Sequence, residues 1–317
     1  MYKREKNIKV LIIWRGPSPY RVDFFNELGK LCDLTVLFER RPDQITDKEK
    51  SWFHEDFTHF KGIYLKSITF RNTAFSLEQF KYLRKNAEYD YIVIGMYSTF
   101  IQMSSLLYLK LFKIPYLLNS DGGFIKKENK ITYYIKRFFI SGAKAYLSSS
   151  KGTSKYLQYY GANNKIMVYP FTTSFQKDVY KNLTAEDKLK YKKILGIKYN
   201  VIILFSGQFI YRKGVDILLK AAKNISKQCG IYIVGGEPTR EYLSLCKENN
   251  LNNVHFIGFT PPQDLAQYYI ASDIYVLPTR EDIWGLVINE AMAYGLPIIT
   301  TAVSYTHLRA HETELHL

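Results

Sequence analysis

The chain has 317 residues, of which 47% are hydrophobic and 23% are charged. This composition excludes a disordered chain, and the length suffices for two domains of ordinary size. The formal net charge of +15 predicts attraction to polyanions, and three cysteines without C-x-x-C spacing indicate a reducing, cytoplasmic setting.

The positive charge lies mainly in the first half of the chain. Residues 1–172 hold 28 Lys and Arg against 15 Asp and Glu, a balance of +13, whereas residues 173–317 hold 16 against 14, a balance of +2. Within residues 126–165, nine bases stand against one acid, Glu128. Such a basic face suits nucleic acid or the anionic inner leaflet of a membrane, or it serves only solubility.

The first half alternates short β-branched runs with helical patterns, which predicts a parallel βαβ sheet. In chain order we expect strand 9–14, helix 20–31, strand 34–38, strand 91–95 after a helix, helix 100–112, and strands 116–118, 145–148 and 166–168. The uncharged span 91–109 has the length of a membrane helix, but its polar residues and Gly95 favour a strand, a turn and a helix.

A second alternating series follows a polar, Lys-rich stretch over residues 173–199, which we interpret as a linker with a helical patch at 185–195. The series predicts strands 201–206, 231–234, 254–257, 274–277 and 298–301, and helices 215–225, 242–248, 263–270 and 286–293. The two series imply an α/β fold of two Rossmann-like, doubly wound domains, residues 1–172 and 200–303. They would face each other across a cleft at the carboxyl ends of their strands.

The last segment, residues 304–317 (SYTHLRAHETELHL), does not continue this pattern. His307 and His311 have the i, i+4 spacing of a helical metal pair, but no third ligand is evident, so no metal site is predicted. The segment resembles translated vector or adapter sequence. We therefore expect a non-native tail and a second domain that lacks its final elements.

The start of helix 286–293 predicts an anion site. Gly285 precedes this helix, so a ligand can approach free backbone N–H groups whose dipole favours a phosphate. Glu290 lies one turn after Leu286, roughly 6 Å along the axis, where it can accept a hydrogen bond from a sugar hydroxyl. Asp282 would face the other side of the phosphate. The alternative makes Asp282 an ordinary N-terminal helix acid and Glu290 a solvated residue.

The loop 207–214 (GQFIYRKG) follows a strong strand and precedes a helix. Its two cations, Arg212 and Lys213, are placed to hold a leaving diphosphate, whose negative charge grows as its sugar departs. The alternative is a basic surface loop.

Together these segments resemble the donor half of a family 4 glycosyltransferase of the GT-B fold, and the resemblance covers nearly all of residues 8–302. It rests on three parts of the sequence: the loop 212–214, the segments 254–258 and 269–278, and the segment 282–291 with its two acids, Asp282 and Glu290, followed by 295–297. It implies that Glu290 binds the nucleotide ribose, that Asp282 contacts the transferred sugar, and that Lys213 binds phosphate. The remaining donor-binding residues implied are Gly207, Gln208, Arg212, Glu281, Ile283, Trp284, Gly285, Leu286 and Val287.

The chain departs from the family pattern at several positions. Asp282 stands where the family has a glutamate, and Glu281 next to it could substitute. Gln208 stands where an arginine is frequent, and Arg212 could compensate for that missing cation. Asp121 stands where many members have a histidine, so it could orient an acceptor or sugar hydroxyl; alternatively, Asp121 and Gly122 form a simple turn. The residues expected to act in catalysis are Asp282, Lys213, Arg212 and Asp121, and those expected to bind acceptor are Pro19, Arg21, Asp121 and Gly122.

The resemblance implies a retaining, metal-independent transferase without a cofactor, and the chain has no D-x-D motif. The expected donor is a nucleotide-diphosphate sugar, and the expected acceptor is a saccharide or a lipid-linked sugar of bacterial capsule or surface polysaccharide. Residues 131–140 (ITYYIKRFFI) suit an anionic membrane surface, which would make the protein peripheral at the inner face, although core packing is the alternative.

Three other classes of function stay open. The first is another GT-B chemistry, such as an epimerase or phosphorylase. The second is a degenerate glycosyltransferase-like scaffold subunit, which the substitutions at Gln208 and Asp282 favour. The third, a nucleic-acid binder, explains the charge but none of the motifs in the second half, so no nucleic-acid partner is expected. Because of its expected truncation, the chain could also be inactive.

Overall fold

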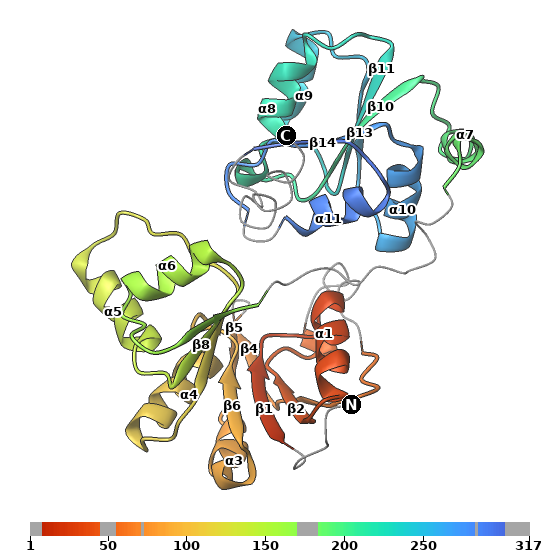
Figure 1. Cartoon of the computed structure of the whole chain (residues 1–317). Helices are drawn as coiled ribbons and strands as arrows, with labels where there is room; N and C mark the ends of the chain where they lie inside the picture. Colours follow the sequence, from red (N-terminus) through yellow and green to blue (C-terminus); the bar gives the residue numbers. More distant parts are fainter. Residues whose placement is uncertain (1–7, 45–54, 71–72, 170–182, 283–284, 302–317) are drawn as a thin grey trace, which may run out of the picture. The chain divides into compact units, whose positions relative to one another are not determined.

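A computed structural model describes residues 8–44, 55–70, 73–169, 183–282 and 285–301. The chain divides into two compact units, Met1–Phe171 and Thr172–Leu317, and each is built on one parallel β-sheet (Figure 1). The predictions for residues 173–182, Ile283, Trp284 and 304–317 lie outside the described residues.

The first unit contains a seven-stranded sheet in the order β3-β2-β1-β6-β7-β8-β9, in which every neighbouring pair is parallel. Its strands are β1 (Lys9–Trp14), β2 (Asp33–Phe38), β3 (Lys61–Tyr64), β6 (Tyr91–Ile94), β7 (Leu117–Ser120), β8 (Ala145–Ser148) and β9 (Ile166–Val168). An antiparallel hairpin joins β4 (Ile68–Phe70) to β5 (Thr73–Phe75). The helices are α1 (Pro19–Gly29), α3 (Gln79–Leu83), α4 (Phe100–Leu111), α5 (Lys130–Ile140) and α6 (Lys151–Tyr159).

The second unit contains a five-stranded parallel sheet in the order β12-β11-β10-β13-β14. Its strands are β10 (Val201–Ser206), β11 (Cys229–Val234), β12 (Val254–Ile257), β13 (Ile274–Leu277) and β14 (Ile298–Thr300). The helices are α7 (Ala185–Ile194), α8 (Val215–Ala222), α9 (Arg240–Glu248), α10 (Pro262–Ala271) and α11 (Leu286–Ala293).

The first sheet has an apolar core on each face, as expected for a parallel sheet covered by helices. Along β1, Leu11 and Ile13 pack into the core under α4 and α6, while Val10, Ile12 and Trp14 pack into the core under α1. Figure 1 shows α1 on one side of this sheet and α4 on the other. Because alternate side chains of β1 point to opposite faces of the sheet, this one apolar strand contributes to both cores.

The predicted α/β fold with two parallel sheets is confirmed. One strand prediction was wrong: β7 does not end at residue 118 but continues through Asn119 and Ser120. These polar residues stay in the strand because their side chains have hydrogen-bond partners; the amide of Asn119 donates to Asp121, and the Ser120 hydroxyl donates to the Gly122 carbonyl.

Other boundaries were also misplaced. Helix α1 ends at Gly29, two residues before the expected end, and α8 ends at Ala222, three residues early. Strand β3, the hairpin and helices α3 and α6 were not predicted individually, because such short elements carry little hydrophobic periodicity of their own.

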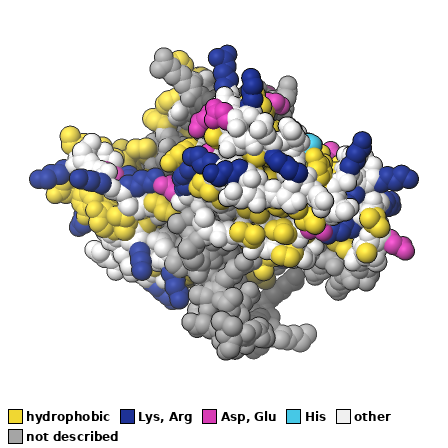
Figure 2. Space-filling view, turned by 90° about the horizontal axis from the view of Figure 1, so that it is seen from above, with side chains coloured by type: hydrophobic (Ala, Val, Ile, Leu, Met, Phe, Trp, Pro, Cys, Tyr) yellow, Lys and Arg dark blue, Asp and Glu magenta, His cyan; other side chains and the backbone are white. Residues whose placement is uncertain are grey.

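The uncharged span 91–109 forms β6, a turn and most of α4, as expected. Among the described residues, no helix has both the length and the apolar character that crossing a bilayer requires. Figure 2 shows that Lys and Arg side chains outnumber those of Asp and Glu on the face in view, in keeping with the formal net charge of +15.

Candidate functional site

The sheet of the second unit has a topological switch point between β10 and β13. From β10 the chain proceeds outward through β11 and β12, and it then returns to place β13 and β14 on the other side. The connections that follow β10 and β13 thus run toward opposite edges of the sheet. In doubly wound sheets, ligands bind at such a switch point, beyond the carboxyl ends of the strands. The two loops at this point are residues 207–214 and, among the described residues, 278–282; sequence analysis singled out the first loop and Asp282 of the second.

Backbone hydrogen bonds tie these two loops together. The Arg212 carbonyl accepts from the Arg280 N–H at 2.8 Å and from the Thr279 hydroxyl at 2.8 Å. Gly214 lies against the same segment with φ of 74°, and a Cβ there would stand 1.9 Å from the Pro278 carbonyl oxygen. Only glycine permits both this left-handed backbone and this close approach.

Gly214→Ala is therefore expected to destabilise the second unit by at least about 3 kcal/mol, because the strained backbone and the clash with Pro278 act together. Urea unfolding followed by circular dichroism measures this change. Gly196 is the matched control, since its φ is 66° but no atom lies within 4 Å of an added Cβ. Gly196→Ala should cost only about 1 kcal/mol. Equal losses for the two variants would contradict the role of the loop contact.

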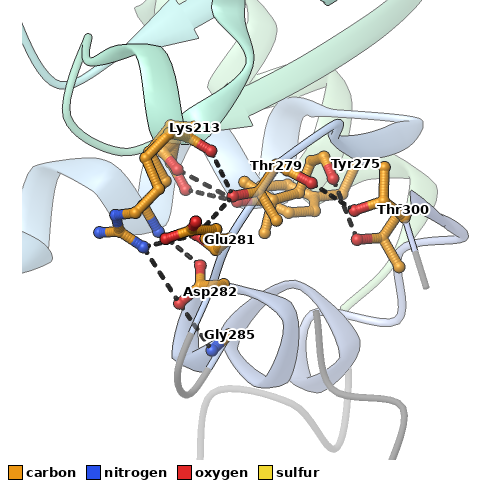
Figure 3. Close-up of polar contacts among 11 residues, drawn as sticks. Lys213, Tyr275, Thr279, Glu281, Asp282, Gly285 and Thr300 are labelled. Atoms are coloured by element: carbon orange, nitrogen blue, oxygen red, sulfur yellow. Dashed lines mark hydrogen bonds and ion pairs between the residues drawn. The ribbon is translucent and has the colours of Figure 1, made fainter. Parts of the chain in front are cut away.

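Three charged side chains meet between the loops. The Lys213 ammonium lies 2.5 Å from one carboxylate oxygen of Asp282 (Figure 3). The Arg212 guanidinium lies 3.8 Å from the other oxygen. Arg212 also donates to the Glu281 carbonyl at 2.7 Å. Only 12% of the Lys213 side chain and 9% of the Asp282 side chain are exposed. Because little water screens this pair, an arriving anion must compete with Asp282 for Lys213.

Asp282 also forms a hydrogen bond to the residue that precedes α11. Its carboxylate accepts a hydrogen bond of 3.2 Å from the N–H of Gly285, whose φ of 58° is left-handed (Figure 3). Asp282 lies outside the first turn of α11, which contains no acid, and the same carboxylate also pairs with Lys213. Leu286 and Val287 form the first turn of α11 and are half-buried.

The first loop contributes two further predicted donor-site residues. Gly207 has φ of 146° and follows β10 directly, and Gln208 is exposed. The predicted donor contact of Gln208 stays a prediction.

Glu290 lies one turn further along α11 and is half-buried. Its carboxylate accepts a 3.0 Å hydrogen bond from the phenol of Tyr269, a residue of α10. The reading of Glu290 as a merely solvated helix residue is therefore wrong. No sequence signal linked Tyr269 to Glu290, because the two lie on different helices.

A second ion pair, which sequence analysis missed, fixes the loop after β13. Arg280 makes two bonds of 2.7 Å to the carboxylate of Asp216 on α8, and its guanidinium stacks 3.9 Å from the ring of Tyr211. The hydrogen bonds from Arg280 lower the pKa of the Asp216 carboxyl below its ordinary value. This pair joins the loop after β13 to the first turn of α8.

The first unit has its own polar cluster at the carboxyl ends of its strands. Arg21, in the first turn of α1, forms an ion pair with Asp121, which follows β7. Asn119 donates to Asp121 at 2.9 Å and accepts at 2.7 Å from Tyr169, whose hydroxyl also accepts from Arg21 at 3.2 Å. The guanidinium of Arg21 lies 4.3 Å from the Trp14 ring. The predicted acceptor residues Arg21 and Asp121 are thus brought together.

The other two predicted acceptor residues have structural contacts. Pro19 occupies the first turn of α1, a position that suits its fixed φ, and the Gly122 carbonyl accepts from Ser120 at 3.1 Å. The turn reading of Asp121 and Gly122 explains the backbone but not the ion pair with Arg21, which nothing in the local sequence indicated.

Glu39, directly after β2, is a buried acid that sequence analysis did not identify. It is 1% exposed and accepts a 3.0 Å hydrogen bond from the Thr99 hydroxyl. Burial raises the pKa of its carboxyl from 4.5 to about 7, against the opposing effect of hydrogen bonds from Thr99 and Gln102. Below pH 4.5 this group is protonated in both the folded and the unfolded chain. Between 4.5 and 7 only the unfolded chain releases the proton, so the free energy of unfolding falls as pH rises.

Glu39→Gln, which is neutral at every pH, should therefore gain stability relative to the wild type between pH 5 and pH 8. The gain is expected to be about 2 kcal/mol, within the limit of about 3 kcal/mol set by the pKa change. Urea titrations at the two pH values measure it. Glu88→Gln, at a surface carboxyl of the same unit, is the control and should show no such difference. A pH-independent effect of Glu39→Gln would contradict the raised pKa.

Among the described residues, no group of three or more His, Cys, Asp and Glu side chains has an arrangement that could hold a metal ion. The site at the switch point of the second sheet offers cations and backbone N–H groups. Its chemistry is therefore that of an anion site bordered by two carboxylates, Asp282 and Glu290.

The fold is that of the GT-B glycosyltransferases. HepE of Anabaena, solved with UDP and glucose, superimposes with a TM-score of 0.69 at 18% identity, covering 94% of this chain and 82% of that one. WaaG, described as a glycosyltransferase involved in lipopolysaccharide biosynthesis, superimposes with a TM-score of 0.66 at 18% identity, covering 96% and 84%. At such identities the similarity establishes the fold class alone.

Residues 187–309, most of the second unit, match the family model of the group 1 glycosyl transferases. An uncharacterized glycosyltransferase of Methanocaldococcus jannaschii is 32% identical over 127 residues, which are 38% of this chain and 33% of that protein. The lipopolysaccharide glucosyltransferase WaaG of Escherichia coli is 31% identical over 124 residues, 37% and 33% of the two chains. A 41.2 kDa protein from the cps region of Klebsiella pneumoniae is 28% identical over 188 residues, 56% and 48%. The matches thus span less than half of these relatives' own length.

Proposed function

We propose that this protein is a retaining glycosyltransferase that moves a sugar from a nucleotide-diphosphate sugar to a saccharide or lipid-linked acceptor. The observation that carries the proposal is the convergence of Lys213, Arg212 and the N-terminus of α11 at the switch point of the second sheet. The group 1 match over residues 187–309 supports it, as do the UDP and UDP-glucose complexes of HepE.

In this proposal the diphosphate lies at the N-terminus of α11, where backbone N–H groups and the helix dipole favour negative charge. Lys213 and Arg212 neutralise the charge that grows on the leaving group. Asp282 accepts a hydrogen bond from the transferred sugar, and Glu290 accepts from the ribose.

Retention of the anomeric configuration is the finer part of the proposal. The bond between the anomeric carbon and the diphosphate oxygen breaks, and the acceptor oxygen forms its bond on the same face. The acceptor's proton passes to an oxygen of the departing phosphate. No separate strong base and no metal is then required, and the protein contributes positioning and charge stabilisation.

We assign acceptor binding to the first unit. Arg21 and Asp121 form a fixed pair at the carboxyl edge of its sheet, so that an acceptor hydroxyl would meet the carboxylate and an acceptor phosphate would meet the guanidinium. The relative from the cps region and the lipopolysaccharide enzyme WaaG favour an acceptor of a bacterial surface polysaccharide.

An anionic membrane surface is the proposed partner of α5. Four apolar side chains at i, i+3, i+4 and i+7 form an exposed stripe along this helix: Ile131 (73% exposed), Tyr134 (64%), Ile135 (49%) and Phe138 (49%). Within this helix the core-packing alternative holds for Ile140, which is buried in the core, and for Tyr133 and Phe139, which pack against it. An apolar stripe beside many Lys residues is typical of a helix that lies at the membrane interface. The protein would then be peripheral at the inner face.

Phe138→Asp should weaken binding to vesicles containing anionic lipid at least about tenfold, because it places a charge in the apolar stripe. Sedimentation with the vesicles measures this. Leu189→Asp, at an exposed leucine of α7 in the other unit, is the control and should bind like the wild type. Wild-type binding should also weaken as salt is added. An absence of binding even at low salt would refute the membrane proposal.

A thermal-shift screen of the chain against UDP-, ADP-, GDP- and dTDP-sugars tests the proposed function. A ligand that binds only the folded state raises the melting temperature, and the hit identifies the donor. The scaffold alternative predicts no stabilisation by any of them, and that result would count against the enzyme.

A further inference from the structure

A chain of three buried hydroxyls leads to the carboxylate of Glu290. The Tyr269 phenol donates to Glu290 at 3.0 Å, and the Ser206 hydroxyl lies 2.8 Å from the Tyr269 oxygen and 3.0 Å from the Tyr275 oxygen. Ser206, Tyr269 and Tyr275 are at most 2% exposed. They come from β10, α10 and β13, so residues of three elements of the second unit form the hydrogen-bond chain that ends at Glu290 of α11.

The direction of the hydrogen bonds follows from the chemistry of the groups. A carboxylate only accepts, so Tyr269 must donate its single proton to Glu290, and its oxygen is left to accept from Ser206. Tyr275 can donate to the Ser206 carbonyl, 3.2 Å away, or to the hydroxyl. Burial, together with the charge of Glu290, raises the pKa of the Tyr269 phenol well above its ordinary value. The phenol is therefore protonated near neutral pH and can act as the donor.

The ring of Tyr269 cannot easily rotate away. It stacks on Tyr294, with centroids 5.1 Å apart and planes 5° from parallel, and Tyr275 lies against it at 5.9 Å. Tyr294 closes α11, and its N–H donates to the Glu290 carbonyl at 3.2 Å. The same helix end thus carries both the carboxylate and the ring that holds its donor in place.

We infer that Tyr269 is a positioning residue that fixes the carboxylate of Glu290 for two adjacent hydroxyls of a ribose, and thereby makes the site selective for ribonucleotides. This inference rests on the proposed function, in which Glu290 binds the ribose. A glutamate on a helix has several rotatable bonds, and a ligand that had to order them would bind less tightly. Tyr269 removes that cost by engaging one carboxylate oxygen, Oε2, before the ligand arrives. A carboxylate has about four acceptor positions, so it can take this bond and further ones from hydroxyls.

The test compares Tyr269→Phe with the wild-type chain by calorimetric titration with UDP and ADP and with the 2′,3′-dideoxy form of each. Loss of the hydrogen bond should weaken binding of the ribonucleotide about tenfold. It should change binding of the dideoxy form by less than about twofold, because that form has no hydroxyl for Glu290. In a Glu290→Gln background, Tyr269→Phe should have no further effect on the ribonucleotide, since the two residues act through one contact.

Two further variants separate positioning from folding. Tyr242→Phe removes the hydroxyl of another buried tyrosine of this unit, 5% exposed and outside the chain of hydroxyls, and should bind both nucleotide forms like the wild type. Ser206→Ala keeps all rings in place and should weaken the ribonucleotide alone, by about threefold, because it removes only the hydroxyl behind Tyr269. It gives the same selective readout should Tyr269→Phe fail to fold.

The outcomes distinguish this inference from the proposed function. If ribonucleotide and dideoxynucleotide weaken equally in Tyr269→Phe and in Ser206→Ala, the hydroxyls are only structural and the inference fails while the donor site stands. If the wild type binds the ribonucleotide and the dideoxynucleotide equally well, Glu290 does not bind the ribose hydroxyls. Both the inference and the assignment of Glu290 as the ribose-binding residue then fail. If the wild type binds none of these nucleotides, the proposed donor site itself is refuted.

Discussion

Lys213→Ala is expected to reduce sugar transfer at least about tenfold, because the ammonium that opposes the charge of the departing diphosphate is lost. The effect should be large, since Lys213 is nearly buried and lies 2.5 Å from Asp282. In such a site an ion pair is weakly screened, and removing the cation also leaves a carboxylate uncompensated. Initial rates of transfer with the donor found by thermal shift measure the change.

The control for this variant is Lys223→Ala, which removes an exposed lysine just after α8 in the same unit and should leave the rate unchanged. Glu290→Gln should also reduce transfer at least about tenfold, because the amide binds ribose hydroxyls less strongly than a carboxylate does. If Lys213→Ala and Glu290→Gln both transfer sugar at the wild-type rate, the donor-site assignment is wrong.

Asp282→Asn is expected to separate binding from transfer. Transfer should fall at least about tenfold, because the neutral amide no longer orients the sugar as the charged carboxylate does. Binding of the nucleoside diphosphate should not weaken, and we expect it to tighten severalfold, because Lys213 and Arg212 no longer have an internal anion to hold them. Titration with the free nucleoside diphosphate and initial-rate kinetics give the two values.

Two companion variants sharpen the result. Asp264→Asn removes an exposed carboxylate of α10 and should change neither value. Asp282→Glu restores the residue that the resembled family has at this position, and it should retain more activity than the asparagine variant. Parallel losses of binding and transfer in Asp282→Asn would mean that Asp282 only supports the loop and the start of α11, through its bond to Gly285.

Much of the fold follows from local sequence because the strands of a parallel sheet covered on both faces are apolar over most of their length. The run VIILFS at 201–206 forms β10, and Leu286–Ala293 forms α11 directly after Gly285, as expected. Where polar residues enter a strand, as Asn119 and Ser120 do in β7, the local pattern misplaces the end. Their partners lie outside the strand, and periodicity contains no information about them.

The site at the switch point of the second sheet could likewise be predicted from the sequence only in part. Glycines and charges placed at strand ends indicated Lys213, Asp282 and Glu290 as residues of one site, because parallel strands bring their carboxyl ends to one edge. That Lys213 and Asp282 bind each other could not be read from the sequence, because a salt bridge between residues 69 positions apart depends on how β10 and β13 are paired.

The sequence by itself determined the two α/β series, the excess of positive charge in the first half, and the residue types at the switch point. Those properties depend on composition, periodicity and chain order. The tertiary structure alone decided the partners: Arg21 with Asp121, Arg280 with Asp216, and Tyr269 with Glu290. Each pair joins different elements, and which side chains meet is settled only when helices pack on a sheet and exclude water from between them.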